Sequence, residues 1–421
     1  MKKNLLSLVC ALALMIMLFP TAQALEGDGA RAADALASLG LVTGTVSDYA
    51  ASAPATQEQA AVLLVRLLGA EQAAADETGR CGWQGIPAWA QSAVNYCALH
   101  DLLSAQEYTP GGTVSAELWC AMLLRALGYG DEIVAGAAHT AQRIGLIARI
   151  PTGALTRGDL FESALAALTF PIRDGGTPLD TLLVKGLCTA DAADALNLRS
   201  GRLTARQAAD RYLSAVLCLD LYTEEALGTG NASSNASAFL ISADGLAITN
   251  YHSISGVVAG TATLVTGEEL AIDSVLYYDA DIDIAVIRIS NRFGSGLVLP
   301  RFNCISLTGT AEVRTGDVVY AIGNPLGLGL SMSQGVVSST SHKADLSSLP
   351  CIVSDATISR GSSGGVLLNE FGHAIAVTAG AYTYGNNMYV GVPVDPAMNV
   401  DSKATGISLK TLAQATAAEA N

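Results

Sequence analysis

A serine, a histidine and an aspartate that could together carry out nucleophilic catalysis stand in the C-terminal half of the chain. Ser363 lies in a Gly-Ser-Ser-Gly-Gly run between two apolar segments, and its glycines predict a tight turn whose N–H groups point toward the hydroxyl. His252 ends one strand-like segment, and Asp283 begins another. A serine hydroxyl is a poor nucleophile until a base takes its proton, and the base works best when a carboxylate fixes its tautomer. The three residues therefore predict a Ser-His-Asp triad.

Each of the three residues also has a simpler interpretation. A Gly/Ser run can form an ordinary hairpin turn, a single histidine is more often structural, and an aspartate at a strand start is usually a turn former. The order of the three contexts along the chain favours the catalytic interpretation.

Four sequence blocks resemble those of the trypsin-like serine proteases of the HtrA (Deg) group. They occur in the family's order within residues 205–397, somewhat under half of the chain. The blocks are Thr249-Asn-Tyr-His252, Asp283-Ile-Ala-Val286, Ala321-Ile-Gly-Asn-Pro-Leu-Gly327 and the segment from Ser354 to Gly365.

This resemblance implies an all-β, trypsin-like double β-barrel over residues 205–400. It implies a serine endopeptidase that acts on proteins or peptides and needs neither a metal nor a cofactor. Ser363 would attack the peptide carbonyl, His252 would act first as base and then as acid, and Asp283 would orient the imidazole. The N–H groups of Gly361 and Ser363 would bind the oxyanion.

The resemblance also implies how a peptide substrate binds. We expect Phe371–Gly380 to be an edge strand to which the peptide adds as another strand, with Val377, Thr378, Ala379 and Gly380 as substrate-binding residues. The small residues of this segment suggest a small or medium apolar side chain before the scissile bond.

Three positions depart from the family pattern. Ser362 replaces the usual Asn, Arg360 a frequent Pro, and Ala236 a Gly. They leave open a second function, a non-catalytic, wall-anchored protein that binds or senses peptides. Residues 401–421 are expected to be a short polar tail, too short to form the family's C-terminal PDZ domain.

The composition of the chain limits which kinds of fold and which binding partners are possible. The chain has 421 residues, 50% of them hydrophobic and 14% charged, which predicts two or three folded domains rather than disorder. Its formal net charge of −15 argues against nucleic acid or an anionic membrane as a partner.

The N-terminus has the pattern of a secretory signal peptide. Lys2 and Lys3 precede an apolar run that ends in Ala22-Gln-Ala24, which predicts cleavage after residue 24. No other apolar stretch is long enough to span a bilayer. We therefore expect a secreted, cell-wall or cell-surface protein of Gram-positive type, with an uncleaved anchor as the alternative.

Residues 25–200 are rich in Ala and Leu at helical spacing, and the pattern repeats. Each unit has a short helix, a polar loop and a longer amphipathic helix that begins with a capping residue. These caps are Thr56, Ser115 and Thr156.

The units resemble S-layer homology (SLH) repeats, which hold cell-wall polysaccharide. The chain is thus expected to be multidomain, an SLH-like helical module followed by the double barrel. Only Thr156, Arg157 and Asp159 approach the repeat's ligand motif; the matching arginine position holds Gln57 in the first unit and Ala116 in the second. A spacer or a protein-contact module is the alternative, since Gln or Ala cannot make the bidentate contact of an arginine.

Tryptophan and cysteine add two expectations. Trp83, Trp89 and Trp119 are predicted to be core anchors, with carbohydrate stacking as the alternative. Seven cysteines follow residue 24, none in a Cys-x-x-Cys arrangement, so a zinc site is not expected. A Cys304–Cys351 disulfide is left open.

Overall fold

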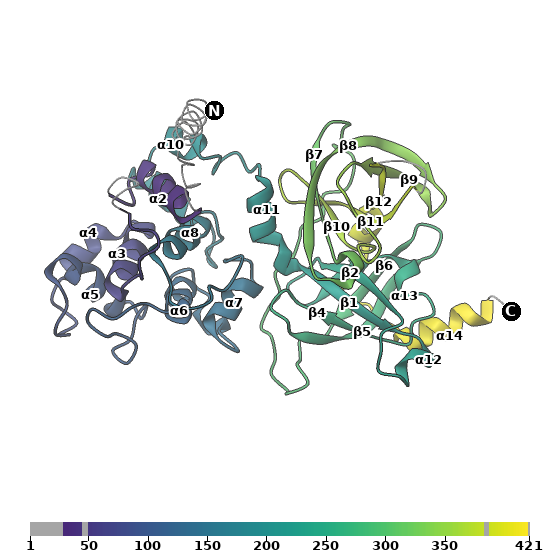
Figure 1. The fold of residues 1–421 in the computed structure, drawn as a ribbon, viewed down its shortest axis with the longest axis horizontal. Coiled ribbons are helices and arrows are strands. Elements are labelled where there is room, and N and C mark those ends of the chain that lie inside the picture. The colour runs from purple at the N-terminus through teal and green to yellow at the C-terminus, as the bar shows by residue number, and fades with distance from the viewer. Residues whose placement is uncertain (1–27, 44–48, 383–386, 420–421) are drawn as a thin grey trace, which may run out of the picture.

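A computed structural model describes residues 28–43, 49–382 and 387–419. A helical module and a β-module lie side by side, with helix α11 between them (Figure 1). The predicted order, an α-helical region followed by β-barrels, is confirmed. The predicted signal peptide, residues 1–24, lies outside the described residues. None of the helices in the described ranges is long and apolar enough to cross a membrane.

The helical module contains short helices that pair around a shared apolar core. Its helices are α2 (Asp28–Ser38), α3 (Gln57–Leu67), α4 (Glu71–Asp76), α5 (Gln91–Leu99), α6 (Ala116–Ala126), α7 (Ala137–Arg143), α8 (Arg157–Ala167), α9 (Pro178–Val184) and α10 (Ala190–Ala195). Helices α3, α6 and α8 have the predicted caps: the side chains of Thr56, Ser115 and Thr156 each accept a backbone hydrogen bond from the third helical residue. The three helix starts are joined by the bridges Pro54–Thr156 and Thr56–Thr113. Because these bridges join the N-terminal ends of α3, α6 and α8, they hold the three helices in fixed positions relative to one another.

The three tryptophans differ in burial. Trp119 is almost wholly buried, and its indole N–H donates to Ser163 Oγ at 2.7 Å. Trp83 stacks on Tyr108, with ring centroids 5.3 Å apart. Trp89 is 59% exposed, so its assignment to the core is wrong. It stands in a single 3-10 turn, η1 (Ala88–Ala90), which buries only Ala90.

The β-module contains two closed barrels. The first has the strand order β1-β2-β3-β6-β5-β4, and the second β10-β11-β12-β9-β8-β7. The first barrel has β1 (Val216–Tyr222), β2 (Ser234–Leu240), β3 (Leu246–Thr249), β4 (Ala259–Thr263), β5 (Glu269–Asp279) and β6 (Ile284–Ile289). The second has β7 (Val318–Gly323), β8 (Ser331–Ala344), β9 (Ser347–Ser354), β10 (Val366–Asn369), β11 (Ala374–Ala381) and β12 (Tyr389–Pro393).

Strand β11 differs from the expected edge strand. Its first half is interior, since Val377 pairs with Val366 of β10 on one side and with Val392 of β12 on the other. Beyond a bulge between Thr378 and Gly380, it pairs with β12 alone. Barrel closure covers the first half, so only the end of this strand offers a free edge.

The C-terminal residues are more than a polar tail. Ile407 exchanges two backbone hydrogen bonds with Val275 of β5. Helix α14 (Leu409–Glu419) follows and buries Leu409 and Leu412 in the apolar core of the first barrel. Residues after 400 therefore contribute to the packing of this barrel.

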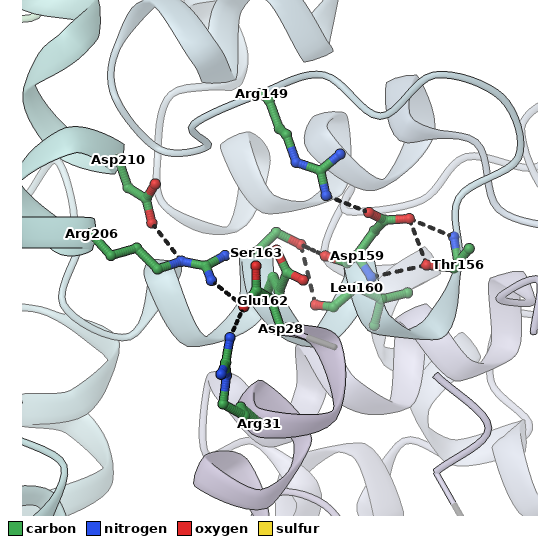
Figure 2. Close-up of polar contacts among 10 residues, drawn as sticks. All are labelled: Asp28, Arg31, Arg149, Thr156, Asp159, Leu160, Glu162, Ser163, Arg206 and Asp210. Carbon is green, nitrogen blue, oxygen red and sulfur yellow. Dashed lines mark hydrogen bonds and ion pairs between the residues drawn. The ribbon is translucent and has the colours of Figure 1, made fainter. Parts of the chain in front are cut away.

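Helix α11 (Ala205–Tyr212) connects the two modules. Arg206 forms ion pairs with Asp28 of α2 at 2.7 Å and with Glu162 of α8 at 3.2 Å (Figure 2). On the barrel side, the Tyr320 hydroxyl donates to the Leu203 carbonyl at 2.6 Å. A cavity of about 380 Å³ with a mostly apolar lining lies between α2, α8 and α11.

Candidate active site

His252 and Asp283 come from neighbouring elements of the first barrel. His252 lies on the single-turn helix α13 (Tyr251–Ile254), directly after β3, and Asp283 immediately precedes β6. Because β3 and β6 pair in register, with Thr249 opposite Ala285, the two side chains meet at the same end of the sheet. The structure brings this predicted pair together.

The Asp283 carboxylate contacts His252 twice. Its Oδ2 lies 2.8 Å from His252 Nδ1, and its Oδ1 accepts the His252 backbone N–H at 2.9 Å. The Asp283 side chain is 5% exposed, whereas the His252 side chain is 49% exposed. A buried acceptor at Nδ1 places the ring proton there and leaves Nε2 free to take a proton.

Asp283 has a left-handed backbone, with φ of 61°. This conformation is rare outside glycine but tolerated by aspartate. The Asn250 side-chain amide, which is fully buried, donates to the Asp283 carbonyl at 3.0 Å and so stabilises the turn.

Cys351 of β9 is a buried thiol close enough to Asp283 to be affected by its charge. Burial is the main cause that raises the pKa of the Cys351 thiol, and the nearby Asp283 charge adds to it. The thiol therefore stays protonated at neutral pH. All seven cysteines from Cys81 to Cys351 are free, so the disulfide between Cys304 and Cys351 does not form.

Ser363 lies in the loop between β9 and β10, where glycines are sterically required. Gly361 and Gly364 have φ of 89° and 86°. A Cβ on Gly364 would lie 2.0 Å from the Ser237 carbonyl oxygen, and one on Gly361 would lie 2.4 Å from the Asn324 oxygen. The loop is thus pressed against its neighbours, and Gly is the only residue that fits without displacement.

The Ser363 hydroxyl donates to the Ala379 carbonyl oxygen at 3.1 Å. Within the described part of the chain, no hydrogen bond joins Ser363 to His252. A rotation about the serine χ1 would be needed to direct the hydroxyl toward Nε2, and such bonds often tighten only when substrate is bound.

Two backbone N–H groups beside Ser363 have no protein acceptor in the described ranges, those of Gly361 and Ser363 itself. These are the two predicted oxyanion donors. An oxyanion hole requires unengaged N–H groups of this kind, one from the nucleophile itself and one from the loop just before it.

Ser237 is a site residue that the sequence analysis missed. Its hydroxyl donates to the Gly361 carbonyl and accepts the Asn324 N–H, both at 2.8 Å. Its own N–H donates to the Ser363 carbonyl at 2.8 Å. It thereby ties the serine loop of the second barrel to β2 of the first. A buried serine within the otherwise apolar end of that strand was the available signal.

The expected substrate-binding residues occupy different environments. Val377 is fully buried, and the Thr378 hydroxyl is engaged with the serine loop. Ala379 presents its carbonyl to Ser363, and Gly380 follows on the half-open end of β11.

The expected wall-ligand residues separate into two groups. Thr156 and Asp159 satisfy each other in a capping box, and Arg149 lies 3.5 Å from Asp159 (Figure 2). Arg157 instead lies over the Phe161 ring, 5.9 Å from its centroid, and has no ion pair with any residue the structure describes. It lines a groove of about 140 Å³ together with the exposed Trp89.

No group of three or more His, Cys, Asp or Glu side chains placed to hold a metal ion occurs in the described ranges.

Two closed six-stranded barrels with a His-Asp pair and a glycine-flanked serine define a trypsin-like β-barrel module. Residues 236–377 match the family described as "Trypsin-like peptidase domain". The chain is 32% identical over 151 residues to a "Probable periplasmic serine endoprotease DegP-like" of Rhizobium meliloti, covering 35% of this chain and 28% of that protein. It is 33% identical over 158 residues to a protein of the same name from Chlamydia pneumoniae, covering 37% of this chain and 30% of that protein.

Among solved structures, "HtrA-type protease AlgW with tripeptide" is 28% identical, with a TM-score of 0.40, covering 47% of this chain and 62% of that one. The chain spans less than a third of the length of the two curated relatives. The matched family region, 236–377, lies wholly within the β-module. The β-module is thus similar to a part of curated serine endoproteases described as DegP-like.

Proposed function

We propose that this protein is a serine endopeptidase that uses Ser363, His252 and Asp283. The observation that carries the proposal is the two-point contact of the Asp283 carboxylate with His252, and the N–H groups of Gly361 and Ser363, which have no acceptor among the described residues, support it. A histidine held in this way is oriented for proton transfer, which a structural histidine does not need.

The reaction would proceed in two halves. Ser363 Oγ attacks the peptide carbonyl carbon while His252 Nε2 takes the hydroxyl proton, and Asp283 stabilises the resulting imidazolium. The imidazolium then donates this proton to the leaving amine, and the C–N bond breaks to give an acyl-enzyme. Water, deprotonated by His252, hydrolyses the ester and regenerates the serine.

The substrate would lie along the open end of β11. Backbone pairing with Ala379 and Gly380 would extend the sheet by one strand and bring the scissile carbonyl to Ser363. The N–H groups of Gly361 and Ser363 would then receive the oxyanion.

Cleavage of unfolded β-casein by the purified chain tests the proposal. We expect the wild type to cleave casein and Ser363→Ala to abolish cleavage. Ser338→Ala, an exposed serine of β8, is the matched control and should leave cleavage unchanged. Casein cleavage that persists in Ser363→Ala would contradict the assignment.

A second function, cell-wall binding by an exported protein, is favoured by the groove that holds Arg157 and Trp89. An arginine that has no acidic partner among the described residues, beside an exposed indole, suits an acidic polysaccharide. Sedimentation with purified cell-wall polysaccharide should be lost in Arg157→Ala and kept in Arg80→Ala, which alters an exposed arginine. Equal sedimentation of both variants would leave the helical module as a spacer.

A further inference from the structure

The two oxyanion donors belong to the peptide units Arg360–Gly361 and Ser362–Ser363. The described residues contain no cis peptide bond, so in each unit the carbonyl and the N–H point in opposite directions. Whatever holds the carbonyls of Arg360 and Ser362 therefore decides where the N–H groups of Gly361 and Ser363 point.

The Ser362 carbonyl is held by Thr378. The Thr378 hydroxyl donates to it at 2.6 Å, and the Gly365 N–H donates to it at 2.9 Å. Thr378 is only 3% exposed and Ser362 only 4% exposed, so water does not compete for this bond.

Backbone hydrogen bonds fix the threonine itself. The Thr378 N–H donates to the Gly365 carbonyl, and the Thr378 carbonyl accepts the Gly364 N–H, both at 2.8 Å. With the side chain included, Thr378 makes three hydrogen bonds to the serine loop. Its hydroxyl is therefore a rigid donor rather than a mobile one.

The Arg360 carbonyl is held from the opposite side. The Leu326 N–H donates to it at 2.6 Å, from a turn in which Leu326 has left-handed angles of φ 59° and ψ 15°. The Leu326 side chain is 64% exposed, so packing does not explain this strained backbone. The preceding Asn324 anchors the turn, because its side-chain oxygen accepts the Gly329 N–H at 2.9 Å.

We propose that Thr378 is a positioning residue whose hydroxyl sets the direction of the Ser363 N–H in the oxyanion hole. This inference rests on the proposed peptidase function and deepens it. Loss of the hydroxyl leaves the Ser362 carbonyl with the Gly365 N–H alone, and the peptide unit then gains freedom to rotate. A rotated Ser362–Ser363 peptide unit no longer directs the Ser363 N–H at the oxyanion of the transition state. The open end of β11, where the substrate would pair, stays intact. The effect should therefore appear in kcat rather than in KM.

The test compares Thr378→Val, which keeps the shape, with Thr378→Ser, which keeps the hydroxyl, in the full chain. Hydrolysis of a p-nitrophenyl ester gives kcat and KM, and a fluorophosphonate probe gives the rate of Ser363 labelling. Thr263→Val on β4 is the control, since its hydroxyl makes no hydrogen bond among the described residues. Where Thr378→Val does not fold, Thr378→Ala takes its place.

We expect Thr378→Val to lower kcat and the labelling rate at least about tenfold, with KM within about threefold. Complete loss of an oxyanion donor lowers kcat by about 10²–10³-fold, which sets the upper limit of the expected effect. Thr378→Ser should restore both rates to within about threefold of wild type. An unchanged kcat in Thr378→Val, a change confined to KM, or no rescue by Thr378→Ser would each overturn the inference while the peptidase function stands. A folded wild type without ester hydrolysis or labelling would overturn the proposed function and this inference with it.

Discussion

The Asp283 carboxylate binds both the ring and the backbone of His252, with one oxygen 2.8 Å from Nδ1 and the other 2.9 Å from the backbone nitrogen. The carboxylate therefore holds both the backbone of α13 and the orientation of the imidazole ring. The position of His252 therefore depends on the charge and on both oxygens of Asp283.

Asp283→Asn tests the ring contact. The amide keeps the size of the side chain, but its NH₂ can face Nδ1 and favour the wrong histidine tautomer. We expect kcat for the ester substrate to fall by about 10³–10⁴-fold at neutral pH, with little change in stability. A loss smaller than about tenfold would show that the carboxylate does not orient the base.

The Glu107–Arg125 pair gives the helical module a defined acid sensitivity. Arg125 donates two hydrogen bonds to Glu107, at 2.7 and 2.9 Å, and this contact lowers the pKa of Glu107 to about 2. A carboxyl with a lowered folded-state pKa contributes stability above its unfolded pKa and loses it as the pH falls. Stability from this pair should be complete above about pH 4.5 and lost toward pH 2.

Urea unfolding of wild type and Glu107→Gln between pH 6 and pH 2.5 measures this contribution. All three tryptophans lie in the helical module, so their fluorescence reports its unfolding. We expect the wild type to be more stable by on the order of 1–2 kcal/mol at pH 6, with the difference shrinking as the pH falls. A difference that does not change with pH would refute the assigned ion pair.

Leu412 tests the docking of α14 on the first barrel. Its side chain is fully buried in the barrel core, so Leu412→Ala should lower the free energy of unfolding by about 2–4 kcal/mol. Lys410→Ala, on the exposed side of the same helix, is the control and should change it by less than about 0.5 kcal/mol. Thermal unfolding followed by far-UV circular dichroism makes the comparison. Equal midpoints for both variants would mean that the helix is not part of the barrel.

The sequence predicted features that local chemistry decides. The helix caps at Thr56, Ser115 and Thr156 formed as expected, because a capping side chain needs only its own next three residues. The turn between β2 and β3 also has a local cause, since Gly245 adopts φ of 97° where a side chain would meet the Ile289 carbonyl. The proximity of His252 and Asp283 was predicted from the order of their sequence motifs along the chain.

Features set by distant parts of the chain could not be predicted in the same way. Whether β11 is an edge depends on β10 and β12, which close the barrel around Val377. The role of Ser237 depends on a loop more than 120 residues away, which no local pattern contains. The burial of Leu409 and Leu412 had a visible signal, two leucines three residues apart, but their partner surface is formed by the first barrel.

Labelling of the folded chain with a fluorophosphonate probe tests the central claim most directly, because the probe reacts only with an activated serine. We predict that the wild type is labelled at Ser363, identified by mass spectrometry of the modified peptide, and that Ser363→Ala and His252→Ala both abolish labelling. His373→Ala, an exposed histidine outside the site, should be labelled at the wild-type rate. An unlabelled wild type that is folded, or labelling that persists in His252→Ala at the wild-type rate, would contradict a working Ser-His-Asp triad.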